Sequence, residues 1–310
     1  MAARTTFERW QLALKPASWP KLLVPFALGQ AIGLDATGRF SWLGFLLALA
    51  FTVADAVFVV LLNDWGDRDV DAIKRRMFPQ TSSKTIADGI LPATKLLIVG
   101  ALAGLVALAF ACLPFAVIDR TLAPIAALVA LGLFVAYTLP PIRMNYRGGG
   151  ELLEALGVGV VLPWISAYLQ SGRVWMPALD SLSGFSILAL ASAIASGLSD
   201  ERSDRAGGKR TLVTLVGNAL SRRVVVGLVG LAPLAWLASA MIPSGTPTMI
   251  LVATAATSAL AWSSIRRASQ PAVTDAFQAQ SHLKSVLHRS IQECGLTLAL
   301  MLALAPWIGL

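Results

Sequence analysis

Long apolar runs, separated by short polar segments, repeat along the whole chain. Many of these runs are close to 20 residues long, which is the length that an α-helix needs to cross the apolar core of a bilayer. No stretch between them is long enough for a soluble domain. We therefore predict an all-α, polytopic membrane protein with one transmembrane domain over residues 1–310 and with its helices around a central cavity. Nine spanning helices are expected, at residues 20–36, 41–62, 94–114, 121–139, 151–169, 181–199, 222–242, 247–265 and 290–309.

The composition supports lipid as the solvent. Hydrophobic residues make up 56% of the chain, only 14% is charged and the mean hydropathy is +0.70, whereas soluble domains carry about 25% charged residues. The net charge of +8 would suggest nucleic acid in a soluble protein. In a membrane protein it is explained by basic loops on the cytoplasmic side, so we expect membrane lipid and no nucleic acid as a partner.

Lysine and arginine are distributed very unevenly between the two sides of the predicted membrane domain. Of the 25 basic residues, 22 lie in the N-terminal segment and in the loops after the second, fourth, sixth and eighth predicted helices, and only Arg39, Arg120 and Arg173 lie on the other side. Basic loops face the cytoplasm in most membrane proteins. The pattern predicts an integral protein of a bacterial inner membrane, with its N-terminus and long polar loops in the cytoplasm.

An acidic motif, residues 63–71, follows the second predicted helix. If that helix continues, Asp64, Asp67 and Asp71 lie at i, i+3 and i+7 and share one face, while Asp69 falls off it. Three carboxylates on one face repel each other unless a cation lies among them. Oxygen ligands of this kind favour Mg²⁺, which often completes its coordination with phosphate and water. A solvated acidic helix end is the alternative, but the interspersed cations suit a metal–phosphate substrate: Arg68, Lys74 and Arg75.

A second charged motif, residues 200–210, follows the sixth predicted helix. Asp200 and Asp204 lie at i and i+4 and again share a face. Two glycines, at 207 and 208, can end that helix and let backbone amides approach an anion. Lys209 and Arg210 can neutralise phosphate charge. Charged loops of this kind are common, so this motif alone is weaker evidence than the first.

The two motifs together indicate a specific chemistry. Both are predicted at the cytoplasmic ends of helices, where they can converge on two metal ions bridged by a diphosphate. Metal and basic side chains would stabilise departing pyrophosphate and leave an allylic cation. An apolar cavity between the helices would hold the lipid tail and keep water away from that cation.

The pattern formed by Asn63, Asp64, Asp67 and Asp71, with Asp200 and Asp204 near the sixth helix, resembles the UbiA superfamily of intramembrane prenyltransferases. The resemblance implies Mg²⁺-dependent transfer of an isoprenyl group from a polyprenyl diphosphate to an aromatic small-molecule acceptor. It implies metal ligands at Asp64, Asp67, Asp71, Asp200 and Asp204, and catalytic roles for Asn63, Asp67 and Tyr137. Binding of the metal diphosphate is assigned to Arg68, Lys74, Arg75, Arg147, Lys209 and Arg210.

Features of two branches of that superfamily are mixed in the sequence. Residues 63–73 are similar to chlorophyll and bacteriochlorophyll synthases, but the Arg-Pro and Ser-Gly steps that usually follow in those enzymes are missing. Residues 137–141 and 146–151 look more like dihydroxynaphthoate prenyltransferases, although Ser196 stands where a long polar residue is frequent. A quinone precursor is therefore the favoured acceptor, and a tetrapyrrole or another lipid acceptor is the alternative.

Several single residues allow two interpretations. Tyr137 either lies beside the reacting centre or anchors its helix at the interface. Arg147 either binds an anionic group or pairs with Glu151. Asp55, inside the second predicted helix, must face protein or a water-filled cavity. His288 lies in an amphipathic segment before the last predicted helix, where we expect a surface role.

Two functions of other classes remain open from the sequence. A transporter would use Asp55 and the cytoplasmic acids to bind cations, but transporters place their sites near the bilayer midplane, and these acids cluster at helix ends. A membrane phosphotransferase also binds two metals through aspartates, but it keeps them in one compact motif. Here the two motifs are far apart along the chain.

Overall fold

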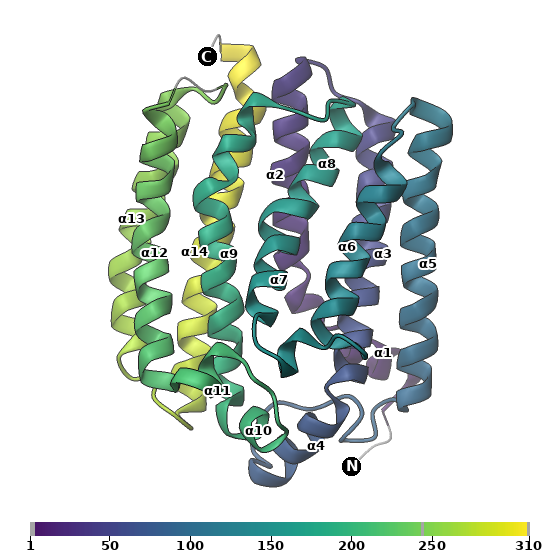
Figure 1. The fold of residues 1–310 in the computed structure, drawn as a ribbon, viewed down its shortest axis with the longest axis vertical. Helices are drawn as coiled ribbons and strands as arrows, with labels where there is room; N and C mark the ends of the chain where they lie inside the picture. The colour runs from purple at the N-terminus through teal and green to yellow at the C-terminus, as the bar shows by residue number, and fades with distance from the viewer. Residues whose placement is uncertain (1–3, 243–244, 309–310) are drawn as a thin grey trace.

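A computed structural model of the chain describes residues 4–242 and 245–308, in which all regular secondary structure is helical (Figure 1). The α-helices are α1 (Thr6–Leu14), α2 (Pro20–Thr37), α3 (Trp42–Gly66), α4 (Arg68–Met77), α5 (Ala93–Ile118), α6 (Ala123–Thr138), α7 (Gly150–Leu156), α8 (Leu162–Ser171), α9 (Leu182–Gly197), α10 (Glu201–Ala206), α11 (Leu212–Val216), α12 (Asn218–Ala240), α13 (Thr248–Ser269) and α14 (Phe277–Ile308). Residue 309 of the last predicted span lies outside the described residues, as do residues 1–3, 243–244 and 310 of the predicted domain.

The all-α, polytopic class is confirmed. A helix lies in each of the nine predicted ranges. Within the described chain, seven helices are long and apolar enough to cross a membrane. Helix α6 is apolar but shorter, and α2 is not among the seven. The count of nine spanning helices therefore stays a prediction.

The long helices run roughly side by side, and the short helices α1, α4, α10 and α11 gather at one end of the bundle (Figure 1). Both acidic motifs lie at this end, because α3 and α9 run toward it and α4 and α10 follow them directly. We call it the motif end.

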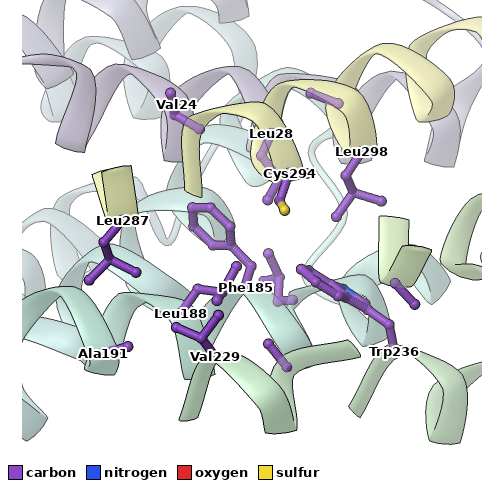
Figure 2. Close-up of a cluster of buried hydrophobic side chains, with 14 of the residues drawn as sticks. Val24, Leu28, Phe185, Leu188, Ala191, Val229, Trp236, Leu287, Cys294 and Leu298 are labelled. Carbon is purple, nitrogen blue, oxygen red and sulfur yellow. The ribbon is translucent and has the colours of Figure 1, made fainter. Parts of the chain in front are cut away.

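The largest buried cluster of apolar side chains joins α2, α9, α12 and α14 (Figure 2). Phe185 and Trp236 are almost fully buried there, and the Trp236 indole nitrogen donates a 2.7 Å hydrogen bond to the Ser181 carbonyl. Lipid tails are as apolar as these side chains, so close van der Waals packing is the main source of stability at such a contact. This contact fixes α9, which carries the second acidic motif.

Helix α2 approaches α8 closely through two glycines one helical turn apart. A Cβ atom on Gly29 would lie 2.2 Å from the Pro163 carbonyl oxygen, and one on Gly33 would lie 2.6 Å from the Ala167 carbonyl oxygen. Small residues four apart let the backbones of two membrane helices approach in this way. The side chain of Gln30 then bridges to Ser166 at 3.0 Å.

We expect Gly29→Val to lower the stability of the protein by about 1–3 kcal/mol, because the added atoms would force α2 and α8 apart. Gly132→Ala on α6 is the control, since a Cβ atom there meets nothing within 4 Å. Thermal unfolding in detergent micelles measures both. An unchanged unfolding temperature for the Gly29 variant would show that the close contact contributes little.

A wide helical turn, residues Gly157–Val161, connects α7 to α8. Pro163 has no amide hydrogen to give to the carbonyl of residue 159. The amide of the preceding residue, Leu162, bonds to the Gly157 carbonyl, five residues back, where an α-helix would use the carbonyl four residues back. Such π-turns are frequent at functional sites. Gly157 and Val158 both line the cavity described next.

Candidate active site

A cavity of about 640 Å³ opens at the motif end and extends between α2, α3, α6, α7, α9 and α14. Its lining changes character along each long helix. On α3 it passes from Asp64 to Val59 and on α6 from Tyr137 to Leu133. From the turn after α9 back along that helix, it passes from Asp200 to Phe185. The motif end is therefore charged and the interior is mostly apolar.

The first motif lies at the joint between α3 and α4. Asp67 forms that joint, with φ −94° and ψ 2°. The spacing of a helix is nearly kept across it, because the Asp67 amide bonds to the Asn63 carbonyl and the Asp71 amide to the Asp67 carbonyl. Asn63, Asp64, Asp67 and Asp71 consequently all line the cavity. The side chain of Asp69 is 77% exposed and is not part of the lining.

The second motif lies where α9 passes through a short 3₁₀ turn into α10. Asp200 and Asp204 both line the cavity. Gly208 has a φ of 78°, which a glycine adopts without strain, and the Lys209 amide then bonds back to the Asp204 carbonyl at 2.8 Å. This turn places the Lys209 side chain in the cavity lining.

The two motifs are joined by lysine side chains. The Nζ atom of Lys209 lies 2.8 Å from Asp67 Oδ1 and 3.7 Å from Asp204 Oδ1. On the other side, Lys74 of α4 pairs with Asp200 of α9–α10. Segments that are distant in sequence therefore meet at one site, as the sequence predicted for a shared diphosphate.

Every aspartate of the two motifs that lines the cavity has a lysine partner. Lys15, just after α1, lies 2.5 Å from Asp64 Oδ1, and the same carboxylate accepts a 2.6 Å hydrogen bond from the Thr85 hydroxyl. Lys84, in the loop after α4, lies 2.5 Å from Asp71. These ammonium groups balance part of the negative charge of the motifs.

Negative charge nevertheless exceeds positive charge in the cavity. Eight carboxylates and five lysines line it within the described residues. Burial alone would lower the pKa of Lys209, but the carboxylates of Asp67 and Asp204 raise it overall. Burial raises the pKa of Asp71 despite the opposing effect of Lys84. The excess of carboxylates favours an added cation.

The donor set fits Mg²⁺. The metal-binding atoms that the acidic side chains of the two motifs offer are all carboxylate oxygens, and the buried Asp67 Oδ1 has the Lys209 ammonium 2.8 Å away. In the part of the chain that the structure describes, no group of three His, Cys, Asp or Glu side chains is arranged to hold a metal ion. Mg²⁺ commonly binds one or two carboxylates together with substrate phosphates and water. Asp64, Asp67, Asp71, Asp200 and Asp204 would share that role.

The six basic residues assigned to the diphosphate from sequence divide into two groups. Lys74 and Lys209 contact motif aspartates. The other four side chains are outside the lining: Arg68 donates to the Trp65 carbonyl, Arg75 to the carbonyls of Pro79, Thr81 and Ser82, Arg147 to the Pro141 carbonyl, and Arg210 is exposed. The structure does not bring these four arginines to the site.

Other basic residues reach the cavity without having been assigned to it from sequence. They are Lys15, Lys21, Lys84 and Lys284. Each lies at the motif end, but in a different segment of the chain. The positive-inside pattern identified the correct end for these lysines and gave no information on which of them point inward.

The remaining candidates also have defined positions. Tyr137 and Glu154 both line the cavity. Glu151 does not pair with Arg147 but accepts a 2.6 Å bond from the Leu212 amide. Asp55 is buried and lines the cavity. The expected surface role of His288 is wrong, because its ring faces the cavity and lies 3.1 Å from the Ser192 hydroxyl.

Residues 22–285 match the sequence model of the UbiA prenyltransferase family. The chain belongs to this family of intramembrane prenyl-transferring enzymes, and the resemblance noted from its motifs is confirmed.

Two curated relatives and one solved structure are similar to the chain. Chlorophyll synthase from Arabidopsis thaliana is 26% identical over 256 residues, which cover 77% of this chain and 62% of the relative, so the chain spans less than two thirds of the plant protein. The 1,4-dihydroxy-2-naphthoate octaprenyltransferase of Mycobacterium tuberculosis is 28% identical over 237 residues, 73% of this chain and 76% of the relative. A UbiA homologue from Archaeoglobus fulgidus, solved with DMAPP and Mg²⁺, shares the fold with a TM-score of 0.68 at 17% identity, over 94% of this chain and 99% of that one.

Proposed function

We propose that the cavity transfers an isoprenyl group from a prenyl diphosphate to an aromatic acceptor, with a quinone precursor favoured. The observation that carries the proposal is the meeting of two aspartate motifs and their lysines at the mouth of a cavity with an apolar interior. The relative that prenylates dihydroxynaphthoate and the fold shared with a homologue bound to DMAPP and Mg²⁺ support it.

The motif aspartates would hold Mg²⁺, which supplies a charge that makes the diphosphate a better leaving group. Lys74, Lys84 and Lys209 stand beside those carboxylates, and their ammonium groups can donate charge-assisted hydrogen bonds to diphosphate oxygens. For Arg68, Arg75, Arg147 and Arg210 we propose a weaker role, the long-range attraction of the anionic substrate to the motif end.

The interior of the cavity protects the reacting carbon. When the bond between C1 of the prenyl chain and the diphosphate oxygen breaks, its electron pair leaves with pyrophosphate. Apolar side chains such as Val59, Leu133 and Phe185 exclude water from the allylic cation that remains. The aromatic ring of Tyr137, which lines the cavity, can stabilise that cation through its π face. The acceptor then bonds to C1 and loses a proton.

A tetrapyrrole acceptor is the second candidate. The similarity to plant chlorophyll synthase and the match of residues 63–73 to that branch favour it. The acceptor class therefore has to be decided by products.

Incubation of the purified protein with Mg²⁺, prenyl diphosphates of several lengths and a panel of acceptors tests the proposal. The panel contains hydroxynaphthoate, hydroxybenzoate and chlorophyllide. We expect a mass increase by one prenyl group in an aromatic acid. Product from chlorophyllide alone would favour the second candidate, and no product from any pair would contradict prenyl transfer.

We also propose that the motif end faces the cytoplasm. The three basic residues Arg39, Arg120 and Arg173 follow α2, α5 and α8 at the other end of the bundle, and the positive-inside rule then gives the orientation. A cysteine introduced at the exposed position Arg202 should react with a membrane-impermeant reagent only after the cells are opened. Labelling in intact cells would contradict the orientation.

A further inference from the structure

A second polar group of side chains lies beside the aspartate motifs and extends from them into the cavity. It consists of Lys21 on α2, Glu154 on α7, and Lys284 and His288 on α14, and we call it the inner cluster. His288 lies against Ser192, eight residues before Asp200. Eight residues of helix correspond to about 12 Å along its axis. The inner cluster therefore begins near the aspartates and reaches into the apolar interior.

Lys284 differs from the other lysines of the cavity in having no partner. Lys15, Lys21, Lys84 and Lys209 each pair with a carboxylate. Lys284 lines the cavity and forms no hydrogen bond or ion pair within residues 4–242 and 245–308. A partly buried ammonium group without a counter-ion is costly, so its presence in a cavity indicates a ligand.

The charges around Lys284 define the kind of ligand. Lys21 and Glu154 form an ion pair and neutralise each other. The inner cluster therefore has two lysines and one carboxylate, which favours an added negative group. One turn deeper on the same face of α14, His288 adds a ring that can donate or accept a hydrogen bond. A monoanionic group with oxygen acceptors complements this arrangement.

We propose that Lys284 binds the acid group of the acceptor and makes the enzyme specific for aromatic carboxylates. The inference rests on the proposed function. The diphosphate is expected beside the motif aspartates, whose lysines can already bind it. The acceptor must place its nucleophilic atom against C1, just inside those aspartates, so a carboxylate on its ring reaches the depth of the inner cluster.

Steady-state kinetics with two acceptors test the assignment. The acceptors are an aromatic acid, such as a hydroxynaphthoate, and the same ring without its carboxyl group. For Lys284→Gln we expect KM for the acid to rise about 10- to 100-fold, as for loss of a hydrogen bond to a charged group. KM for the prenyl diphosphate and KM for the acceptor without the acid should change less than about twofold, within the effect of a neutral surface change. Lys284→Arg should retain most of the preference for the acid.

The controls separate this inference from the proposed function. Lys95→Gln, an exposed lysine at the same end, should leave all three KM values unchanged, and the unfolding temperature shows whether the Lys284 variants fold. A rise in KM for the prenyl diphosphate would assign Lys284 to the donor and overturn the inference. An equal rise for both acceptors would also overturn it. Prenylation of only uncharged acceptors by the wild-type enzyme would also overturn the inference about Lys284, but it would agree with the proposed prenyl transfer. Absence of any product would contradict the proposed function itself.

Discussion

Asp64→Ala and Asp200→Ala are each expected to lower the rate of prenyl transfer about 100- to 1000-fold, because stabilisation by a bound metal amounts to several kcal/mol. The two carboxylates lie on opposite sides of the cavity mouth, on α3 and at the start of α10. Each substitution would remove a ligand of the metal diphosphate and leave the apolar interior unchanged. Product formation by mass spectrometry, at saturating Mg²⁺ and prenyl diphosphate, measures the loss.

Asp69→Ala is the matched control. Asp69 belongs to the same motif, but its side chain is 77% exposed and is not part of the cavity lining. Its activity should stay within about twofold of the wild type, since exposed substitutions away from such features have small effects. Full activity in both the Asp64 and Asp200 variants would refute the metal-site account.

Lys209→Gln is expected to destabilise the protein by about 3–5 kcal/mol, the usual cost of removing one partner from a buried ion pair. Lys209 is 8% exposed and lies between the carboxylates of Asp67 and Asp204. Without it, two buried carboxylates would repel each other. The pKa of Lys209 is raised in the folded state, so its contribution is fully present below the pKa of an unfolded lysine. Burial raises the pKa of Asp204 to about 7, so the effect should be constant from about pH 8 to 9 and smaller near pH 6, where Asp204 is protonated.

Added Mg²⁺ should restore part of this stability, because a divalent cation can take the place of the ammonium group between the carboxylates. Thermal unfolding in detergent, with and without Mg²⁺, checks both expectations. Arg210→Gln changes the neighbouring exposed position and should have little effect. An unfolding temperature of Lys209→Gln equal to that of the wild type would show that this lysine does not hold the two motifs together.

The sequence was informative about the helices because their apolar runs are long. Each predicted range contains a helix, but apolar periodicity does not fix helix ends. Helix α14 begins at Phe277, well before the predicted start at residue 290, because an amphipathic first half continues directly into the apolar second half. The surface expectation for His288 failed for this reason, since that first half also faces the cavity.

The carboxylates of the site could be predicted because they lie on helices, where spacing determines which residues share a face. Asp67 lies on the predicted face even though α3 ends at Gly66, because helical backbone hydrogen bonds continue across the joint between α3 and α4. The cations could not be predicted in the same way. Lys84 lies in a loop with no periodicity, and it reaches Asp71 only because the loop folds back.

There is also a physical reason why lysines contact the motif aspartates and the arginines assigned from sequence do not. Arg75 has several donors in a fixed plane and uses them to hold the carbonyls of the loop after α4. Lysine is a single charge on a flexible stem, which suits exchange between carboxylates and a bound phosphate. Proximity of basic residues to a motif in sequence does not distinguish these two uses.

Coupled release of pyrophosphate and prenylated product by the purified enzyme tests the central claim most directly. With Mg²⁺, a prenyl diphosphate and an aromatic acid, the account predicts one pyrophosphate for each prenylated acceptor, and loss of both in Asp200→Ala. Prenylated product formed at the wild-type rate by Asp200→Ala, or no product from the wild-type enzyme with any acceptor, would contradict the account.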